Sequence, residues 1–321
     1  MKQLFEGVHI LEGEIGGRPL QLIYLRGATA SLLMDTGCAH DPAKFIAPQI
    51  AEAGGEVSSL TWILNTHPDL DHICGNHEMK RFAPHAILGC GDADRHICQG
   101  IDTLMQYRYD VYKNDHGIAY EGDTLEWIRA EGGKPEAIDV TFRGGEHIRL
   151  GPEWEVELLA VPGHAEGHLA VYDPLHQALY GGDAIHGSGN PGRAGGVKLC
   201  PTYENVDEYL GTIDRIEGLP ITTYVGCHWP VKRGAEIAEF CRESRDFVQT
   251  TERVLLDRLT KPHTLRELCT ILGRELGEWP RETDLELVYV LNGHLRRMCE
   301  HGMVSSRMRN NGRPVREFVR S

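Results

Sequence analysis

The stretch NTHPDLDHICGN, residues 65–76, places four side chains that bind metals within six positions: His67, Asp69, Asp71 and His72. An apolar run comes directly before it and is typical of a buried strand. Imidazole nitrogen and carboxylate oxygen both bind zinc and similar ions, at about 2.0–2.2 Å. After a strand, alternate residues can turn His67 and Asp69 to one side, while the start of a helix presents Asp71 and His72 to the other. One loop could therefore serve two adjacent metal ions.

Three further candidates each follow a predicted strand. His164 lies at a Pro-Gly turn, Asp183 ends the run QALYGGD, and His228 follows a strand in YVGCHWP. The two glycines before Asp183 allow a close backbone approach. Because each candidate ends a strand, all of them can converge on one edge of the fold. Another histidine, His168, lies within a predicted strand, and we expect it to form hydrogen bonds inside the fold rather than to bind metal.

Composition restricts the kind of partner. The chain has 321 residues and a formal charge of -14 at pH 7. Nucleic acids and anionic membranes favour basic surfaces, so a small-molecule substrate fits better than either. No stretch reaches the roughly 18 uninterrupted apolar residues of a membrane span, and the first residues lack a signal-peptide pattern, so we expect a cytoplasmic protein without membrane association. The nine cysteines include no C-x-x-C pair, which predicts reduced thiols rather than disulfides or a thiolate zinc site.

Short apolar runs that alternate with turns fill most of the first 245 residues. VHILEGEI, LQLIYLRG and SLTWILNT are typical of strands, and DPAKFIAPQIAEAGG is typical of a helix. This alternation predicts a layered α/β or α+β domain over residues 1–245. The stretch from about 93 to 128 instead has helical spacing, along which lie Met105, Tyr107, Tyr109 and Tyr112. We interpret it as an inserted helical cap whose side chains could cover a substrate, although packing explains them equally well.

From residue 246 the pattern changes to three amphipathic helices and a β-hairpin that turns on Asn310, Asn311 and Gly312. Residues 246–321 hold 13 basic and 11 acidic side chains, a net charge of +2, and the remainder holds 20 and 36, a net charge of −16. This asymmetry favours a domain boundary near 245 and a small winged-helix-like domain after it. DNA recognition would need a more basic recognition helix, so a packing or dimerisation role is favoured and a homodimer is possible.

The order of these motifs, H-x-D-x-D-H, then G-H, then G-D and a late G-x-H, resembles the metallo-β-lactamase superfamily over roughly residues 8 to 235. MDTG at 34–37 matches the Asp-Thr-Gly turn that those proteins carry beneath the metals. The resemblance implies a four-layer αββα sandwich, and Asp35 of that turn is expected to orient a ligand or the loop. It also implies the ligands of two metal ions: His67, Asp69 and His164 for the first, Asp71, His72 and His228 for the second, and Asp183 between them.

Asp69 departs from the usual family pattern, H-x-H-x-D-H. A third carboxylate shifts the preference of the site from zinc toward iron or manganese, although metal availability can override it. Asp69 could bind the first metal, or its shorter reach could leave a single-metal site. We expect two divalent ions, with zinc as the first choice and iron or manganese as alternatives.

The resemblance implies a metal-dependent hydrolase that uses a metal-bound hydroxide. Asp71 could accept the proton and pass it to the leaving group. In lactonases of the superfamily a tyrosine near the bridging aspartate polarises the substrate carbonyl, and His186 could do so here. The C-terminal part resembles the tail of the β-lactamase-like-2 group, which includes acyl thioesterases. A small ester, thioester or lactone is therefore the expected substrate.

Two other functions remain open. A non-haem iron oxidoreductase or dioxygenase fits the carboxylate-rich motif, but the flavodiiron branch needs a flavodoxin-like domain for which residues 246–321 are too few. A nucleic-acid-processing hydrolase shares the predicted fold, but the acidic main domain argues against nucleic acid as a partner.

Overall fold

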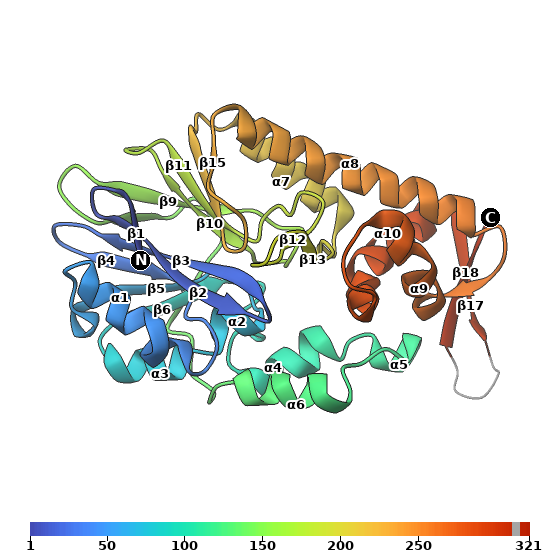
Figure 1. The fold of residues 1–321 in the computed structure, drawn as a ribbon, viewed down its shortest axis with the longest axis horizontal. Helices are drawn as coiled ribbons and strands as arrows, with labels where there is room; N and C mark the ends of the chain where they lie inside the picture. The colour runs from blue at the N-terminus through green and yellow to red at the C-terminus, as the bar shows by residue number, and fades with distance from the viewer. Residues whose placement is uncertain (310–314) are drawn as a thin grey trace.

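The computed structural model describes residues 1–309 and 315–321, and its core is a pair of β-sheets packed face to face (Figure 1). Side chains of both sheets meet in one buried cluster, in which Ile10 and Leu32 of the first sheet join Leu158 and Val171 of the second. Helices cover the outer face of each sheet. The predicted four-layer αββα sandwich is confirmed.

The first sheet contains seven strands in chain order. They are β1 (Lys2–Phe5), β2 (Val8–Ile15), β3 (Arg18–Arg26), β4 (Ser31–Met34), β5 (Trp62–Asn65), β6 (Ile87–Gly91) and β7 (Val140–Phe142). Strands β1 to β4 pair antiparallel, whereas β4 to β7 pair parallel. Parallel strands end at the same edge, so the residues that follow β4 and β5 lie side by side.

The second sheet has the order β15-β14-β11-β10-β9-β8. Its strands are β8 (His147–Arg149), β9 (Glu155–Ala160), β10 (Leu169–Asp173), β11 (Ala178–Gly182), β14 (Thr223–Gly226) and β15 (Lys232–Arg233). Strands β11 and β14 pair in parallel, which places the residues after both at one edge. A small ribbon of β12 (Asn190–Pro191) and β13 (Val197–Leu199) lies beyond β11 in the chain.

Short helices cover the first sheet and longer ones cover the second. The former are η1 (Pro42–Ile46), α1 (Ala47–Glu52), η2 (Val57–Ser59), α2 (Leu70–Ile73) and α3 (Asn76–Phe82). The latter are α7 (Val206–Gly218) and α8 (Ala235–Arg258). Asn205 caps α7 by accepting a hydrogen bond from the Glu208 amide, and acidic residues in its first turn favour the same start.

Between β6 and β7 the chain forms a helical segment, residues 101–131, where the sequence predicted an insertion. It contains α4 (Ile101–Leu104), η3 (Met105–Tyr109), α5 (Lys113–His116) and α6 (Gly122–Glu131). Figure 1 shows it leaving the sandwich and extending toward the C-terminal helices. Met105 and Tyr112 are buried in the hydrophobic core, so at these two positions packing, not an exposed binding surface, explains the residue type.

The predicted C-terminal helices and hairpin are present. The first predicted helix is the C-terminal end of α8, and the other two are α9 (Leu265–Leu276) and α10 (Val288–Glu300), with η4 (Arg281–Leu287) between them. They are followed by β17 (Val304–Arg309) and β18 (Val315–Arg320), and β18 pairs also with β16 (His263–Thr264). A capping box between Thr264 and Glu267 starts α9. The predicted turn at Asn310, Asn311 and Gly312 lies outside the described residues. The winged-helix classification stays a prediction.

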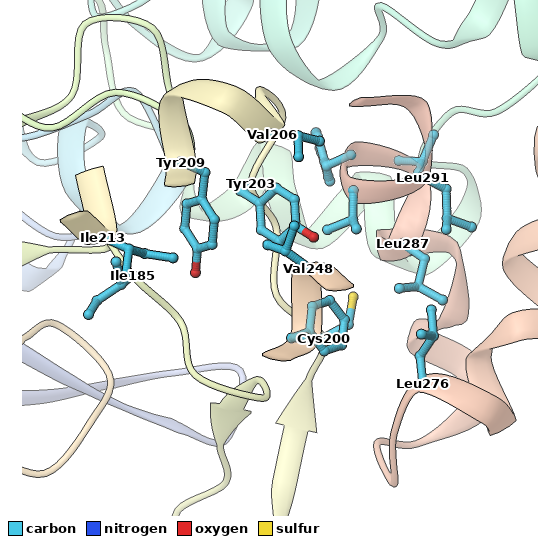
Figure 2. Packing of buried hydrophobic residues seen from close by; sticks show 14 of the residues in the cluster. Ile185, Cys200, Tyr203, Val206, Tyr209, Ile213, Val248, Leu276, Leu287 and Leu291 are labelled. Atoms are coloured by element: carbon cyan, nitrogen blue, oxygen red, sulfur yellow. The ribbon is translucent and has the colours of Figure 1, made fainter. Parts of the chain in front are cut away.

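A single hydrophobic core crosses the predicted domain boundary. Helix α8 passes residue 245 without interruption, and one cluster joins Tyr203 and Tyr209 to Leu287 and Leu291 of the C-terminal helices (Figure 2). Residues 1–245 and 246–321 therefore share buried apolar surface, and the boundary itself stays a prediction.

Within residues 1–309 and 315–321, no helix combines the length and the apolar character needed to cross a membrane.

We predict that Leu291→Ala destabilises the whole chain in a single transition. Leu291 is fully buried in the shared core, and such truncations cost about 2–5 kcal/mol of unfolding free energy. Urea unfolding, followed by far-ultraviolet circular dichroism and by tryptophan fluorescence, measures this loss. Leu175→Ala is the control, because Leu175 is 55% exposed and its loss should change stability by less than about 0.5 kcal/mol. Two separate transitions would show that the C-terminal part folds independently.

Candidate metal centre

The loops at the common edge of the two sheets bring the predicted ligands together. His67 follows β5, and His164 lies in the loop after β9. Asp69 lies between them: its Oδ2 atom is 2.9 Å from His164 Nε2 and 3.4 Å from His67 Nε2. These three residues form one of the groups whose ligand atoms lie within 4.8 Å of one another.

A second group forms beside the first. Asp71 and His72 lie on the single turn of α2, and His228 follows β14. His228 Nε2 is 3.4 Å from Asp71 Oδ2 and 3.3 Å from Asp183 Oδ2, and His72 Nε2 is 3.8 Å from Asp71 Oδ1. His67, His72 and Asp183 also form a group of their own, which places Asp183 between the two sets.

Each of the four candidate histidines is held through Nδ1. His72 Nδ1 lies 2.9 Å from Asp35 Oδ2, and His67 Nδ1 lies 2.9 Å from Thr66 Oγ1, which itself donates to Asp35. His164 Nδ1 and His228 Nδ1 lie near the carbonyl oxygens of Thr202 and Pro19, at 3.2 Å and 2.7 Å. These oxygens accept hydrogen bonds, so the protons belong on Nδ1. Each Nε2 can then bind a metal through its lone pair, once it carries no proton of its own.

Buried polar atoms without partners test whether metal ions fit. His67 Nε2, His72 Nε2, Asp71 Oδ2 and Asp183 Oδ1 are inaccessible to solvent and form no hydrogen bond within the described structure. Such atoms normally carry a substantial desolvation cost. Divalent ions would satisfy all four, because neutral imidazole and carboxylate are the donors that zinc, iron and manganese accept. The residues present therefore fit a metal centre.

The charge states also suit metal ions. Burial alone would raise the pKa of Asp183, but the interaction with the neighbouring His228 ring holds that pKa well below its ordinary value. Burial lowers the pKa of His67 well below the ordinary histidine value, so its ring is neutral at pH 7. Burial would also lower the pKa of His72, but the carboxylates of Asp35 and Asp71 outweigh it and raise that pKa. A metal that binds His72 must therefore displace a proton.

Comparison with known proteins decides the family. A model described as the metallo-beta-lactamase superfamily matches residues 16–228, about two thirds of the chain. The chain belongs to this superfamily.

Two solved structures share the fold. A family protein of Thermus thermophilus aligns with a TM-score of 0.77 at 23% identity, over 99% of this chain and 100% of that one. A beta-lactamase domain protein of Burkholderia ambifaria aligns with a TM-score of 0.74 at 17% identity, over 100% of this chain and 93% of that one. Both alignments include the C-terminal helices.

The curated relatives are named hydroxyacylglutathione hydrolases. One from Synechococcus sp. strain JA-3-3Ab is 30% identical over 217 residues, which is 65% of this chain and 66% of that protein. One from Methylococcus capsulatus is 26% identical over 278 residues, 81% of this chain and 84% of that protein. The family and these relatives support a hydrolase enzyme that binds divalent metal.

Asp35 and Gly182 shape the backbone beside the candidate ligands. Asp35 accepts hydrogen bonds from the Thr66 amide and hydroxyl, at 2.8 Å each, so it orients the metal loop as expected. Its φ of 65° is a left-handed conformation that aspartate tolerates better than most residues. A Cβ at Gly182 would approach His168 Nε2 to 2.8 Å, and its φ of +58° also favours glycine. The expected close backbone approach before Asp183 is present.

Two other histidines behave differently from the expectations. His186 is fully buried, its Nε2 donates to the Asp183 carbonyl at 2.8 Å, and its Nδ1 accepts from the Thr202 amide at 3.1 Å. Both ring nitrogens are hydrogen-bonded to backbone groups, so this geometry gives no support to a role of His186 in polarising a substrate carbonyl. His168 stacks on His67 with ring centroids 4.6 Å apart, and neither of its nitrogens has a hydrogen-bond partner in the described residues. The expectation that His168 hydrogen-bonds within the fold is wrong.

Arg108 is a cation that contacts this site and was not among the residues predicted from the sequence. Arg108 of η3 is buried, and its Nε donates to Asp69 Oδ1 at 2.6 Å. The neighbouring Tyr109 hydroxyl lies 3.3 Å from the same oxygen and accepts from the Leu70 amide at 3.1 Å. A charged residue within an otherwise aromatic helical stretch was the available signal, but no motif ties it to the metal loop.

A cavity opens beside the candidate ligands, and its walls come from four parts of the chain. Asp69, Asp71, Asp183 and His228 line its floor. The other lining groups include Arg18 of β3, Tyr109, Tyr120 and Trp127 of the helical segment, Lys198 of β13, and Glu286 and Tyr289 of the C-terminal helices. The C-terminal part therefore forms a wall of the cavity rather than a remote appendage.

We predict that His72→Ala combined with His228→Ala removes most of the metal bound in the second group while leaving the first. Each substitution deletes an Nε2 ligand that the fold has already oriented. Plasma mass spectrometry should find about two ions per chain in the parent and about one in the variant. His147→Ala, at a largely exposed histidine remote from the candidate ligands, is the control, and circular dichroism checks folding. Full occupancy in the double variant would contradict the ligand assignment.

Proposed function

We propose that this protein hydrolyses a small thioester with two divalent metal ions, for which zinc is the first choice. The observation that carries the proposal is the convergence of four oriented Nε2 atoms with Asp71 and Asp183, each of which has one buried oxygen without a hydrogen-bond partner in the described structure. The proposed ligands are His67, Asp69 and His164 for one ion, Asp71, His72 and His228 for the other, and Asp183 for both.

When bound, the ions would supply a nucleophile from water at neutral pH and stabilise negative charge on the substrate oxygen. Three carboxylates make the ligand set harder than a site built mainly from histidine, so iron or manganese are the alternatives. Metal analysis of the purified protein separates these choices, and iron would favour the oxidoreductase alternative.

Asp71 is the residue we assign to proton transfer. Its Oδ2 atom is buried and without a hydrogen-bond partner in the described structure, and the side chain lines the cavity. Arg18 Nη2 lies 4.0 Å from this oxygen. Asp71 can therefore accept a proton at the floor of the cavity and return it to the leaving group.

The relatives favour a thioester among the possible substrates. Their name specifies hydrolysis of hydroxyacyl derivatives of glutathione, which are thioesters. The cavity agrees with a small-molecule substrate: it offers aromatic walls for an apolar group and the cations Arg18 and Lys198 beside the floor.

We predict that the protein hydrolyses thioesters faster than the matched oxygen esters, lactones and phosphodiesters. Release of free thiol, followed with a chromogenic thiol reagent, measures kcat/KM for each compound. A chelator should abolish the activity, and added zinc should restore it. Asp71→Asn, assayed at a zinc concentration that restores the metal content of the parent, should lower kcat by about 10²–10⁴-fold, because proton transfer contributes about that much. Equal kcat/KM across the panel would contradict thioester specificity.

The carboxyl group of Glu286, in the cavity wall, bears on which substrate the cavity favours. Its carboxylate accepts a hydrogen bond from the Tyr120 hydroxyl at 2.8 Å, and Tyr120 lies 3.2 Å from the Tyr289 hydroxyl. Burial raises the pKa of Glu286 to about 7. The group is therefore neutral below this pH and charged above it, in a cavity wall made of tyrosines. A carboxylate among aromatic rings suits a substrate group that carries an ammonium.

We expect thioesters with an amino group to gain kcat/KM over neutral isosteres as pH rises through about 7, provided the amine stays protonated. Glu286→Gln should remove this pH dependence of the ratio. Glu282→Gln, at an exposed residue of the same η4 helix, should leave it intact. A ratio that stays the same in Glu286→Gln would exclude recognition of the amine by this carboxylate.

A further inference from the structure

Arg108 is a buried cation at the edge of the candidate metal centre. Its side chain is 5% exposed and is carried by the helical segment, not by the sandwich. Two of its nitrogens contact Asp69: Nε lies 2.6 Å from Oδ1 and Nη2 lies 3.1 Å from Oδ2. This paired geometry fixes the plane of the carboxylate as well as its position.

The two oxygens of Asp69 have different surroundings. Oδ1 is bonded by Arg108 Nε and lies 3.3 Å from the Tyr109 hydroxyl. Oδ2 faces His164 Nε2 and His67 Nε2, the two nitrogens of the first candidate group. Arg108 Nη2 also contacts Oδ2, but a carboxylate oxygen has more than one lone pair, so Oδ2 can accept this hydrogen bond and still face the place where a metal would bind.

Charge gives a second reason for the pair. A neutral histidine usually occupies this position in the motif that the chain resembles, so Asp69 adds a negative charge to the site. The Arg108 guanidinium, which contacts both oxygens of this carboxylate, compensates the added charge. Glu204 also contacts Arg108, through one hydrogen bond of 3.0 Å, but its side chain is 34% exposed against 19% for Asp69. Asp69 is the closer and better-buried partner.

We propose that Arg108 is a positioning residue that makes Asp69 a charge-compensated, one-oxygen metal ligand in place of the usual histidine. The proposal rests on the metal centre assigned under Proposed function, but not on the substrate. It predicts that substitutions at residues 69 and 108 have coupled effects on metal affinity. While Arg108 remains, Asp69→His should weaken metal binding, because the cation would then face both the metal and an uncharged ring with little charge compensation.

A double-mutant cycle in metal affinity tests this coupling. Chelator competition measures the zinc dissociation constant of the first position in the parent, Asp69→His, Arg108→Met and the double variant Asp69→His with Arg108→Met. We expect Asp69→His to bind zinc about 10–100-fold more weakly than the parent, as for other lost supporting groups. The double variant, with the usual histidine and no cation, should recover to within about threefold of the parent.

Control variants separate positioning from simple anchoring of the helical segment. Arg129→Met removes an exposed ion pair with Asp102 within the same segment, and zinc affinity should not change. Arg108→Lys keeps the charge but loses the paired hydrogen bonds, so it should bind zinc with intermediate affinity. Asp69→Asn keeps a hydrogen-bonding side chain without the charge and should weaken zinc binding about tenfold or more.

Two results would overturn the proposal. Equal zinc affinity in Asp69→His and the double variant would show that the two residues are not coupled. Parent-like affinity in Asp69→Asn would show that Asp69 does not bind metal. Circular dichroism and thermal unfolding of each metal-free variant identify any loss that reflects misfolding. The readout is metal affinity, so a failure to hydrolyse thioesters would count against the proposed function and leave this proposal standing.

Discussion

The orientation of four histidines through their Nδ1 atoms is the constraint on which the rest of the structure depends. Each ring needs an acceptor behind it so that Nε2 points inward, and the acceptors come from distant parts of the chain: the Asp35 turn, the carbonyl of Pro19, the carbonyl of Thr202 and the Thr66 hydroxyl. A free imidazole would rotate and alternate between tautomers. The two sheets must therefore pack in one fixed relative position, since any displacement would separate a ring from its acceptor.

This arrangement leaves the edge of the sandwich rich in buried polar atoms, and other parts of the chain enclose it. The helical segment supplies Arg108 and Tyr109 to one side, and the C-terminal helices supply Glu286 and Tyr289 to the wall of the cavity. Exclusion of water strengthens electrostatic interactions inside such a site. The parts of the chain outside the sandwich thus contribute to the chemistry of the site as well as to its shape.

The shared core explains how the C-terminal helices keep that place. Tyr203 stacks on Tyr209 with ring centroids 4.2 Å apart, and its hydroxyl lies 2.9 Å from His294 Nε2 on α10. These contacts join the loop behind His164 to the C-terminal part through buried surface. A wall of the cavity is therefore fixed by the same packing that stabilises the fold, and changes in that core should also alter the cavity.

Local pattern was enough to predict a layered α/β or α+β domain and to single out candidate ligands at strand ends, because both depend on short-range features, and the family resemblance added the four-layer sandwich. Strands, turns and the residues that end them are encoded by spacing, and parallel strands bring their ends to one edge. The helical segment and the C-terminal hairpin followed from periodicity in the same way. Arg108 beside Asp69, the two committed nitrogens of His186 and the partnerless ring of His168 were decided by tertiary structure alone. Arg108 meets Asp69 across 39 positions and His186 meets the Thr202 amide across 16, and a sequence holds no local signal for such contacts.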